Sequence, residues 1–248
     1  MKTKHPDEVI NDLLGYDGLK IIQRPDMFNF SLDSTLLADF AVCTPSTRLI
    51  VDLGTGFAPI PLFLSLKTQA QIVGIELQEA VADIAKRSVL LNHLENQIKI
   101  VCEDIKQLPK HFKTSSVDLI TCNPPFFKVT LDAKINASPY KTIARHEVAI
   151  DLPHIAKVAQ VLLKTKGKLF MVHRAERLFE LTEILHAHRL QVKRLRYVHP
   201  RIGEPANMVL LEAILGGRPG VKVHPPLIVH EGTAYSQEIM RIFHYGRT

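Results

Sequence analysis

The sequence predicts an α/β fold in which one mostly parallel sheet carries helices on both faces. The first observation is a regular alternation of short apolar runs, typical of buried strands, with longer segments that have helical apolar spacing. The second is that turns rich in glycine or proline follow two of these runs, at 54–56 and 124–125. We therefore expect a single domain over 1–248, with an N-terminal extension and helix over 1–44 and a C-terminal tail over 216–248.

The elements can be placed in order along the chain. Segments near 19–23 and 28–30 suggest a small hairpin, and Ser31 or Asp33 is the expected N-cap of a helix over 34–43. Residues 127–150 lack clear periodicity, and we interpret them as a mobile or substrate-ordered segment. The tail is expected to add a hairpin and a terminal helix. Strands are expected at 48–53, 71–75, 97–102, 117–122, 167–173, 191–198 and 208–215, and helices at 59–67, 78–93, 105–108, 152–163 and 175–188.

The composition is that of an ordinary globular protein, with 46% apolar and 23% charged residues. No apolar run has transmembrane length and the N-terminus is polar, so we expect a cytoplasmic protein. The three cysteines, Cys43, Cys102 and Cys122, are widely spaced and form no CxxC pair. We expect free buried thiols, with neither a metal site nor disulfides.

The net charge of +6 is unevenly distributed. Through Pro124 there are 12 Lys/Arg against 15 Asp/Glu, and after it there are 19 against 10. A basic second half suggests that a polyanion such as RNA docks there, although a merely basic, soluble surface would give the same counts. The candidate contacts to substrate are Lys128, Arg145, His146, Arg174, Arg196 and Arg201.

The stretch Asn123-Pro124-Pro125-Phe126 directly follows a predicted strand. Neither proline can donate to a sheet ladder, so a rigid loop begins where the strand stops. Open α/β sheets bind ligands at the carboxyl ends of their strands. The amide oxygen of Asn123 and the Pro124 carbonyl could accept both N–H groups of a planar amine, while Phe126 stacks on its face. Taken alone, the stretch is equally compatible with ordinary turn chemistry.

A second motif, Asp52-Leu53-Gly54-Thr55-Gly56, follows the first predicted strand. Glycines at a strand-to-helix turn let a ligand approach the backbone closely. Pro59 stands where a dinucleotide fingerprint has its third glycine, and Asp52 would repel a pyrophosphate. S-adenosylmethionine (SAM) carries an ammonium and a sulfonium and no phosphate. The motif therefore favours SAM as the cofactor.

Acidic side chains also follow the next two strands. Glu76, with its neighbour Leu77, lies 22 positions after Gly54, where an acid is expected to bind a ribose diol. Asp104, with its neighbour Ile105, follows the third strand and could meet an adenine amine. Each of these carboxylates is also compatible with a plain helix cap, and for Asp33 a cofactor-side role is the alternative to capping.

Together these motifs resemble those of class I SAM-dependent methyltransferases that modify exocyclic or amide nitrogens. The stretches 30–37, 52–61, 123–126, 144–147 and 205–207 resemble the bacterial tRNA1(Val) (adenine-37-N6)-methyltransferase family, over nearly the whole chain. The resemblance implies a Rossmann-like class I methyltransferase fold with a seven-stranded, mostly parallel sheet. It also implies methylation of adenine N6 beside a tRNA anticodon. Ala58 departs from the family, in which another glycine tends to stand there.

The resemblance assigns a catalytic role to Asn123, Pro124, Pro125 and Phe126, with Asn123 also beside the cofactor. We expect the acceptors on Asn123 and Pro124 to aim the N6 lone pair at the sulfonium methyl. Two other enzyme activities remain open, because rRNA guanine-N2 enzymes share the NPPF signature and a glutamine amide offers the same NH2 group. A SAM-binding or RNA-binding module without catalysis is the remaining alternative.

Overall fold

The computed structural model describes residues 4–13, 16–27, 32–124 and 151–244. Its central sheet has the strand order β10-β8-β9-β7-β6-β3-β4-β5, with β11 also pairing with β8. The strands are β3 (Leu49–Leu53), β4 (Gln71–Glu76), β5 (Ile98–Cys102), β6 (Val117–Cys122), β7 (Leu163–Arg174), β8 (Leu190–His199), β9 (Met208–Leu215), β10 (Lys222–Val223) and β11 (Leu227–Ile228). Only β9 runs antiparallel to its neighbours, so the expected mostly parallel sheet is confirmed. The two short strands β10 and β11 extend it beyond the seven expected.

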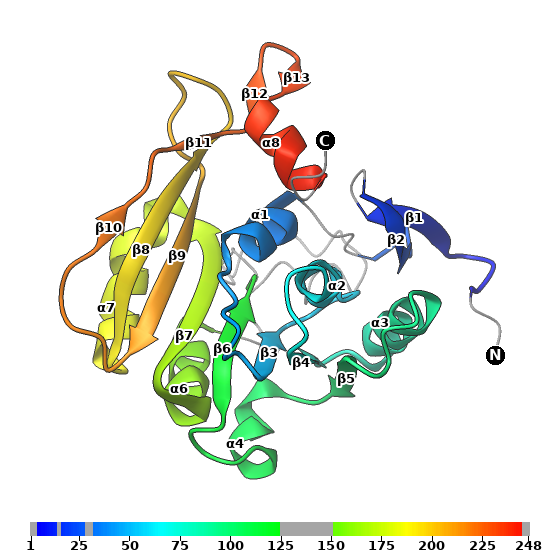
Figure 1. Cartoon of the computed structure of the whole chain (residues 1–248), viewed down its shortest axis with the longest axis horizontal. Coiled ribbons are helices and arrows are strands. Elements are labelled where there is room, and N and C mark those ends of the chain that lie inside the picture. The colour runs from blue at the N-terminus through cyan, green and yellow to red at the C-terminus, as the bar shows by residue number, and fades with distance from the viewer. Residues whose placement is uncertain (1–3, 14–15, 28–31, 125–150, 245–248) are drawn as a thin grey trace, which may run out of the picture.

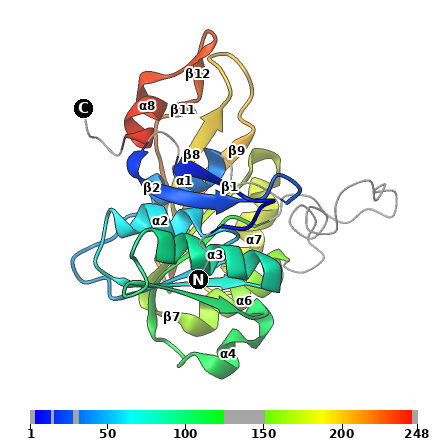
Figure 2. The same ribbon diagram turned by 90° about the vertical axis from the view of Figure 1, so that its right-hand side faces the viewer.

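Helices cover both faces of this sheet, as Figures 1 and 2 show. One face packs against α1 (Leu32–Phe40), α2 (Pro59–Ser65) and α3 (Glu79–Leu91). The other packs against η1 (Ile105–Gln107), α4 (Leu108–His111), α6 (Leu152–Leu162) and α7 (Leu178–Ala187), the last preceded by η2 (Ala175–Arg177). Because both faces are buried, β3 and β6 are almost continuously apolar. No helix in the described ranges is long and apolar enough to cross a membrane.

The N-terminal hairpin differs from the expected one. Residues 19–23 do lie in a strand, β2 (Tyr16–Gln23), but its partner is β1 (Val9–Leu13), upstream of it. Residues 28–30, the expected partner, lie outside the described part of the chain. The hairpin is held on α3 by a buried ion pair in which Arg87 donates to Glu8 over 2.6 Å, and by Ser88 Oγ, which accepts from the Ile22 N–H.

Helix α1 was expected over 34–43 and instead spans Leu32–Phe40. Asp33 therefore lies inside the first turn and is not the N-cap, while Ser31 is outside the described residues. The early end has a physical cause. Lys67 Nζ donates to the carbonyl oxygens of Ala38, Asp39 and Ala41 over 2.7–2.8 Å, which caps the carboxyl end of the helix with a positive charge.

Two further expectations need correction. β7 begins four residues earlier than expected, because Leu163 pairs with Val117 before an irregularity in β7, after which pairing with β6 resumes at Lys168 opposite Leu119. Cys102 is exposed and Cys43 is half-buried, so of the three thiols only Cys122 is fully buried.

The expected tail elements are confirmed as a hairpin of β12 (His230–Glu231) with β13 (Ala234–Tyr235) and the helix α8 (Gln237–Phe243).

Candidate active site

The turn after β3 is built from residues in left-handed conformations. Gly54 has a φ of 71° and Gly56 a φ of 56°, values that glycine adopts without steric cost. The Thr55 N–H donates to the Ile75 carbonyl over 2.8 Å, which ties the turn to β4. A Cβ placed on Gly56 would meet no atom of the described residues within 4 Å, so among these residues the turn faces open space on that side. A ligand can therefore approach the backbone there.

Asp52 lies beneath this turn and has no exposed surface. One carboxylate oxygen accepts from Thr55 Oγ1 over 2.7 Å, and the other accepts from Thr121 Oγ1 over 2.6 Å. Burial raises the pKa of Asp52 to about 7, although the two hydroxyl donors lower it. Asp52 thus bridges the glycine turn and β6, and a direct contact to the cofactor ammonium stays a prediction.

Gly74 was not singled out from the sequence, yet the turn depends on it. It lies in the middle of β4, opposite Asp52 on β3. A Cβ on Gly74 would lie 2.8 Å from Thr55 Oγ1 and 2.8 Å from Ile100 Cδ1. The available signal was a glycine inside an apolar strand pattern, which often marks a close approach.

Glu76 ends β4 beside the turn and is almost fully buried. One of its carboxylate oxygens accepts from the Gly56 N–H over 3.0 Å and the other from the Gln78 N–H over 2.9 Å. Burial raises its pKa, while these backbone donors lower it. The next residue, Leu77, is 39% exposed at the same edge. The structure therefore brings Glu76 to the glycine turn, and its contact to a ribose stays a prediction.

Asp104 follows β5 and caps η1, since one of its oxygens accepts from the Lys106 N–H over 2.9 Å. The capping role considered from the sequence is confirmed, and a role toward adenine stays a prediction. Its neighbour Ile105 is buried in the core.

Asn123 follows β6 at the same edge of the sheet as the glycine turn, because β3 and β6 are parallel neighbours. Its side-chain Nδ2 donates to Ser34 Oγ over 3.2 Å, which links the end of β6 to α1. Ser34 was not singled out from the sequence, and no sequence signal pairs two residues so far apart. Asp33 precedes it in α1, and Pro124 is buried. Pro125, Phe126, Lys128, Arg145 and His146 lie outside the described residues.

The remaining basic candidates are spread over the second half of the sheet. Arg174 ends β7. Arg196, on β8, donates to Glu238 over 2.8 Å and to the Pro225 carbonyl over 2.9 Å. Arg201 follows β8, and its Nη1 lies 3.4 Å from Glu204 Oε1. The structure therefore gives Arg196 and Arg201 intramolecular carboxylate partners, and contacts to RNA stay predictions for all three.

Comparisons with known proteins agree with this geometry. Residues 50–145 match the family model described as "Methyltransferase domain". A tRNA1(Val) (adenine(37)-N6)-methyltransferase from one strain of Porphyromonas gingivalis is 30% identical, over 77% of this chain and 76% of the relative. The relative of the same name from a second strain is 29% identical over 93% of each chain. A crystal structure described as a "predicted O-methyltransferase" from Agrobacterium tumefaciens superposes with a TM-score of 0.68, at 21% identity, over 87% of this chain and 97% of that one. The last likeness shows the fold alone.

Proposed function

Because this chain belongs to the tRNA1(Val) (adenine(37)-N6)-methyltransferase family, we propose that it transfers the methyl group of SAM to N6 of adenine 37 in tRNA1(Val). The observation that carries the proposal is the meeting of the glycine turn, Glu76 and Asn123 at one edge of the sheet. The anticodon loop is the part of the RNA that would enter this edge, since it presents adenine 37 unpaired.

The residues at this edge fit SAM. The backbone at Gly56 faces open space, and the Glu76 carboxylate beside it can accept hydrogen bonds from ribose hydroxyls. Thr55 and Asp52 hold the turn in place from below. SAM supplies an electrophilic methyl group on a sulfonium, and the role of these side chains is to bind and orient it.

Asn123 supplies the acceptor for the adenine amine. Its Nδ2 is directed to Ser34 Oγ, so Oδ1 is the amide atom left to accept an N6–H. The Pro124 carbonyl provides the second acceptor. Two accepted hydrogen bonds turn the N6 lone pair out of conjugation and toward the methyl donor. Holding two reactants in line is worth roughly 7 kcal/mol or more of the barrier. No side-chain base is needed, because the methylated nitrogen is strongly acidic until it loses its proton.

The test is nucleoside analysis by mass spectrometry after incubation of a tRNA1(Val) transcript with the protein and SAM carrying a CD3 group. We expect labelled N6-methyladenosine, and we expect it to vanish when adenine 37 is replaced by guanine. Label on guanine N2 or on a protein glutamine would support a different acceptor. Absence of transferred label from every acceptor, with SAM still bound, would support a binding module without catalysis.

A further inference from the structure

The described chain has an acid-poor, basic edge where β8 and the segment 216–224 lie. Residues 184–203 and 213–230 contain no Asp or Glu. They contain the cations Arg189, Lys193, Arg194, Arg196, Arg201, Arg218 and Lys222. Because β10 pairs with β8, in the register Lys222 opposite Arg194, the two segments form one continuous edge of the sheet.

The carboxylates that face this edge are too few to neutralise it. Two cations share the Glu212 carboxylate: Oε2 accepts from Arg194 over 2.8 Å, and Oε1 lies 3.4 Å from Lys168 Nζ. Lys193 instead donates to two backbone carbonyls, of Arg218 over 3.1 Å and of Pro219 over 3.4 Å. A carbonyl does not cancel a charge, so this contact fixes the ammonium in place and leaves the site positive. Within the described ranges, no carboxylate forms an ion pair with Lys193, Arg218 or Lys222.

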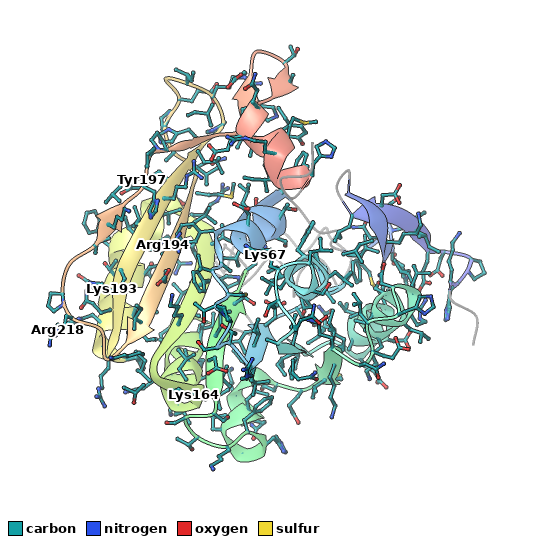
Figure 3. The ribbon with its side chains drawn as sticks, in the orientation of Figure 1. Lys67, Lys164, Lys193, Arg194, Tyr197 and Arg218 are labelled. Carbon is teal, nitrogen blue, oxygen red and sulfur yellow. The ribbon has the colours of Figure 1, made fainter. Side chains whose placement is uncertain are left out.

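The backbone brings Arg218 to the same edge as Lys193. The turn after β9 uses Gly216 and Gly220 in left-handed conformations, with φ values of 67° and 108°. It folds the chain back so that Arg218 sits beside Lys193, and both project along the same edge in Figure 3. Arg218 and Lys222 are exposed. Because these three cations form no ion pair with a carboxylate of the described residues, a bound polyanion would meet uncompensated positive charge at this edge.

The edge lies within reach of the candidate active site. β8 is three strands from β6, which carries Asn123 at its end, and β10 is four strands away. At about 4.8 Å between strands, these separations across the sheet are roughly 14 and 19 Å. Along the strands, Lys222 is level with Thr121, two residues before Asn123. Phosphates along one nucleic-acid strand of a duplex recur about every 3.4 Å along its axis, so an RNA whose base reaches Asn123 can extend its backbone over this edge.

We infer that Lys193, Arg218 and Lys222 form a phosphate-binding edge that holds the RNA backbone while the target base sits at Asn123. This inference rests on the proposed function for the identity of the RNA. Contacts of this kind position a nucleic acid and carry no base sequence information. The edge therefore contributes affinity for RNA, and the candidate active site selects the base.

The experiment measures binding of a tRNA1(Val) transcript by filter retention at several salt concentrations, and separately measures SAM binding and methyl transfer. The variant is Lys193→Gln/Arg218→Gln/Lys222→Gln. The matched control is Lys86→Gln/Lys99→Gln/Lys113→Gln, which removes three exposed lysines from α3, β5 and the loop after α4, all outside the β8–β10 edge. We expect the first variant to bind at least tenfold more weakly at low salt, with a salt slope smaller by about two to three, and SAM affinity to stay unchanged.

The outcomes separate this inference from the proposed function. Wild-type affinity and salt slope in the first variant, or an equal loss in the control, would overturn the phosphate-binding edge even if adenine is methylated. RNA binding that depends on the three cations without any methyl transfer would uphold the edge and overturn the proposed function. No RNA binding by the wild-type protein would overturn the edge.

Discussion

The buried carboxylate of Asp52 gives a quantitative prediction about stability and pH. Burial raises its pKa in the folded protein to about 7, from an ordinary value of 3.8. The folded state therefore holds a proton that the unfolded state releases. This contribution to stability is complete below about pH 4 and is lost as the pH rises to about 7. Three pH units at about 1.4 kcal/mol each correspond to a loss of roughly 4 kcal/mol, of which about 3 kcal/mol falls above pH 5.

The variant Asp52→Asn tests this reasoning, because an amide offers one acceptor and one donor, as the protonated carboxyl does. Thr55 and Thr121 can both still be paired. We expect the free energy of unfolding of the variant, relative to that of the wild-type protein, to grow by about 3 kcal/mol between pH 5 and pH 8.

The assay is urea unfolding of both proteins at pH 5, 6, 7 and 8, compared as a difference in free energy of unfolding at each pH. Taking this difference cancels the pH dependence that the other ionisable groups give to the stability of both proteins. His173 in particular is buried with its pKa lowered to about 4, so it makes stability rise with pH between about 4 and 6.5 and partly masks Asp52 in the wild-type profile. A difference between the two proteins that does not change with pH would refute the reasoning, as would a variant that is less stable at pH 8.

Three further predictions concern the turn and its neighbours. Gly74→Ala should destabilise the protein by about 1–3 kcal/mol and weaken SAM binding, because its Cβ would lie 2.8 Å from Thr55 Oγ1; wild-type urea midpoints and SAM titrations would contradict this. Ala58 has a φ of 69°, so Ala58→Gly should relieve about 1 kcal/mol of backbone strain, which offsets the loss of a buried methyl group. The control Ala85→Gly, in α3, should lower the free energy of unfolding by about 1.5 kcal/mol. Equal losses of stability for the two variants in thermal melts would argue against strain at residue 58. Glu76→Gln should raise the Kd for SAM at least tenfold in calorimetry with turnover at saturating SAM largely kept, and an unchanged Kd would exclude the carboxylate from the cofactor site.

The sequence predicts the fold of the parallel half well because both of its signals are local. Apolar runs and glycine or proline punctuation set β3 to β6 within a residue or so at each end. The pairing of β2 with β1 was not predicted because strand pairing is non-local: four of the five residues of β1 are exposed, and its apolar and polar residues do not alternate. The end of α1 was placed too late because the lysine that caps it, Lys67, comes from the turn after α2.

The site was predictable where it follows strand ends and less so where it depends on packing. Asp52, Glu76 and Asn123 could be found because parallel strands bring their carboxyl ends to one edge. That Asp52 is completely buried and bonded to Thr121, that Gly74 makes room for Thr55, and that Ser34 holds the Asn123 amide all depend on side chains from distant segments. Such pairings carry no periodic signal along the chain.

The central claim is that Asn123 positions the acceptor amine and does not determine the affinity for SAM. The most direct measurement is single-turnover methyl transfer to tRNA1(Val) by Asn123→Ala, alongside the Kd for SAM of the same preparation. We predict a loss of the methyl-transfer rate of at least a hundredfold with a Kd within about twofold of the wild-type value. A variant that transfers the methyl group at the wild-type rate, or one whose only defect is weaker SAM binding, would contradict the account.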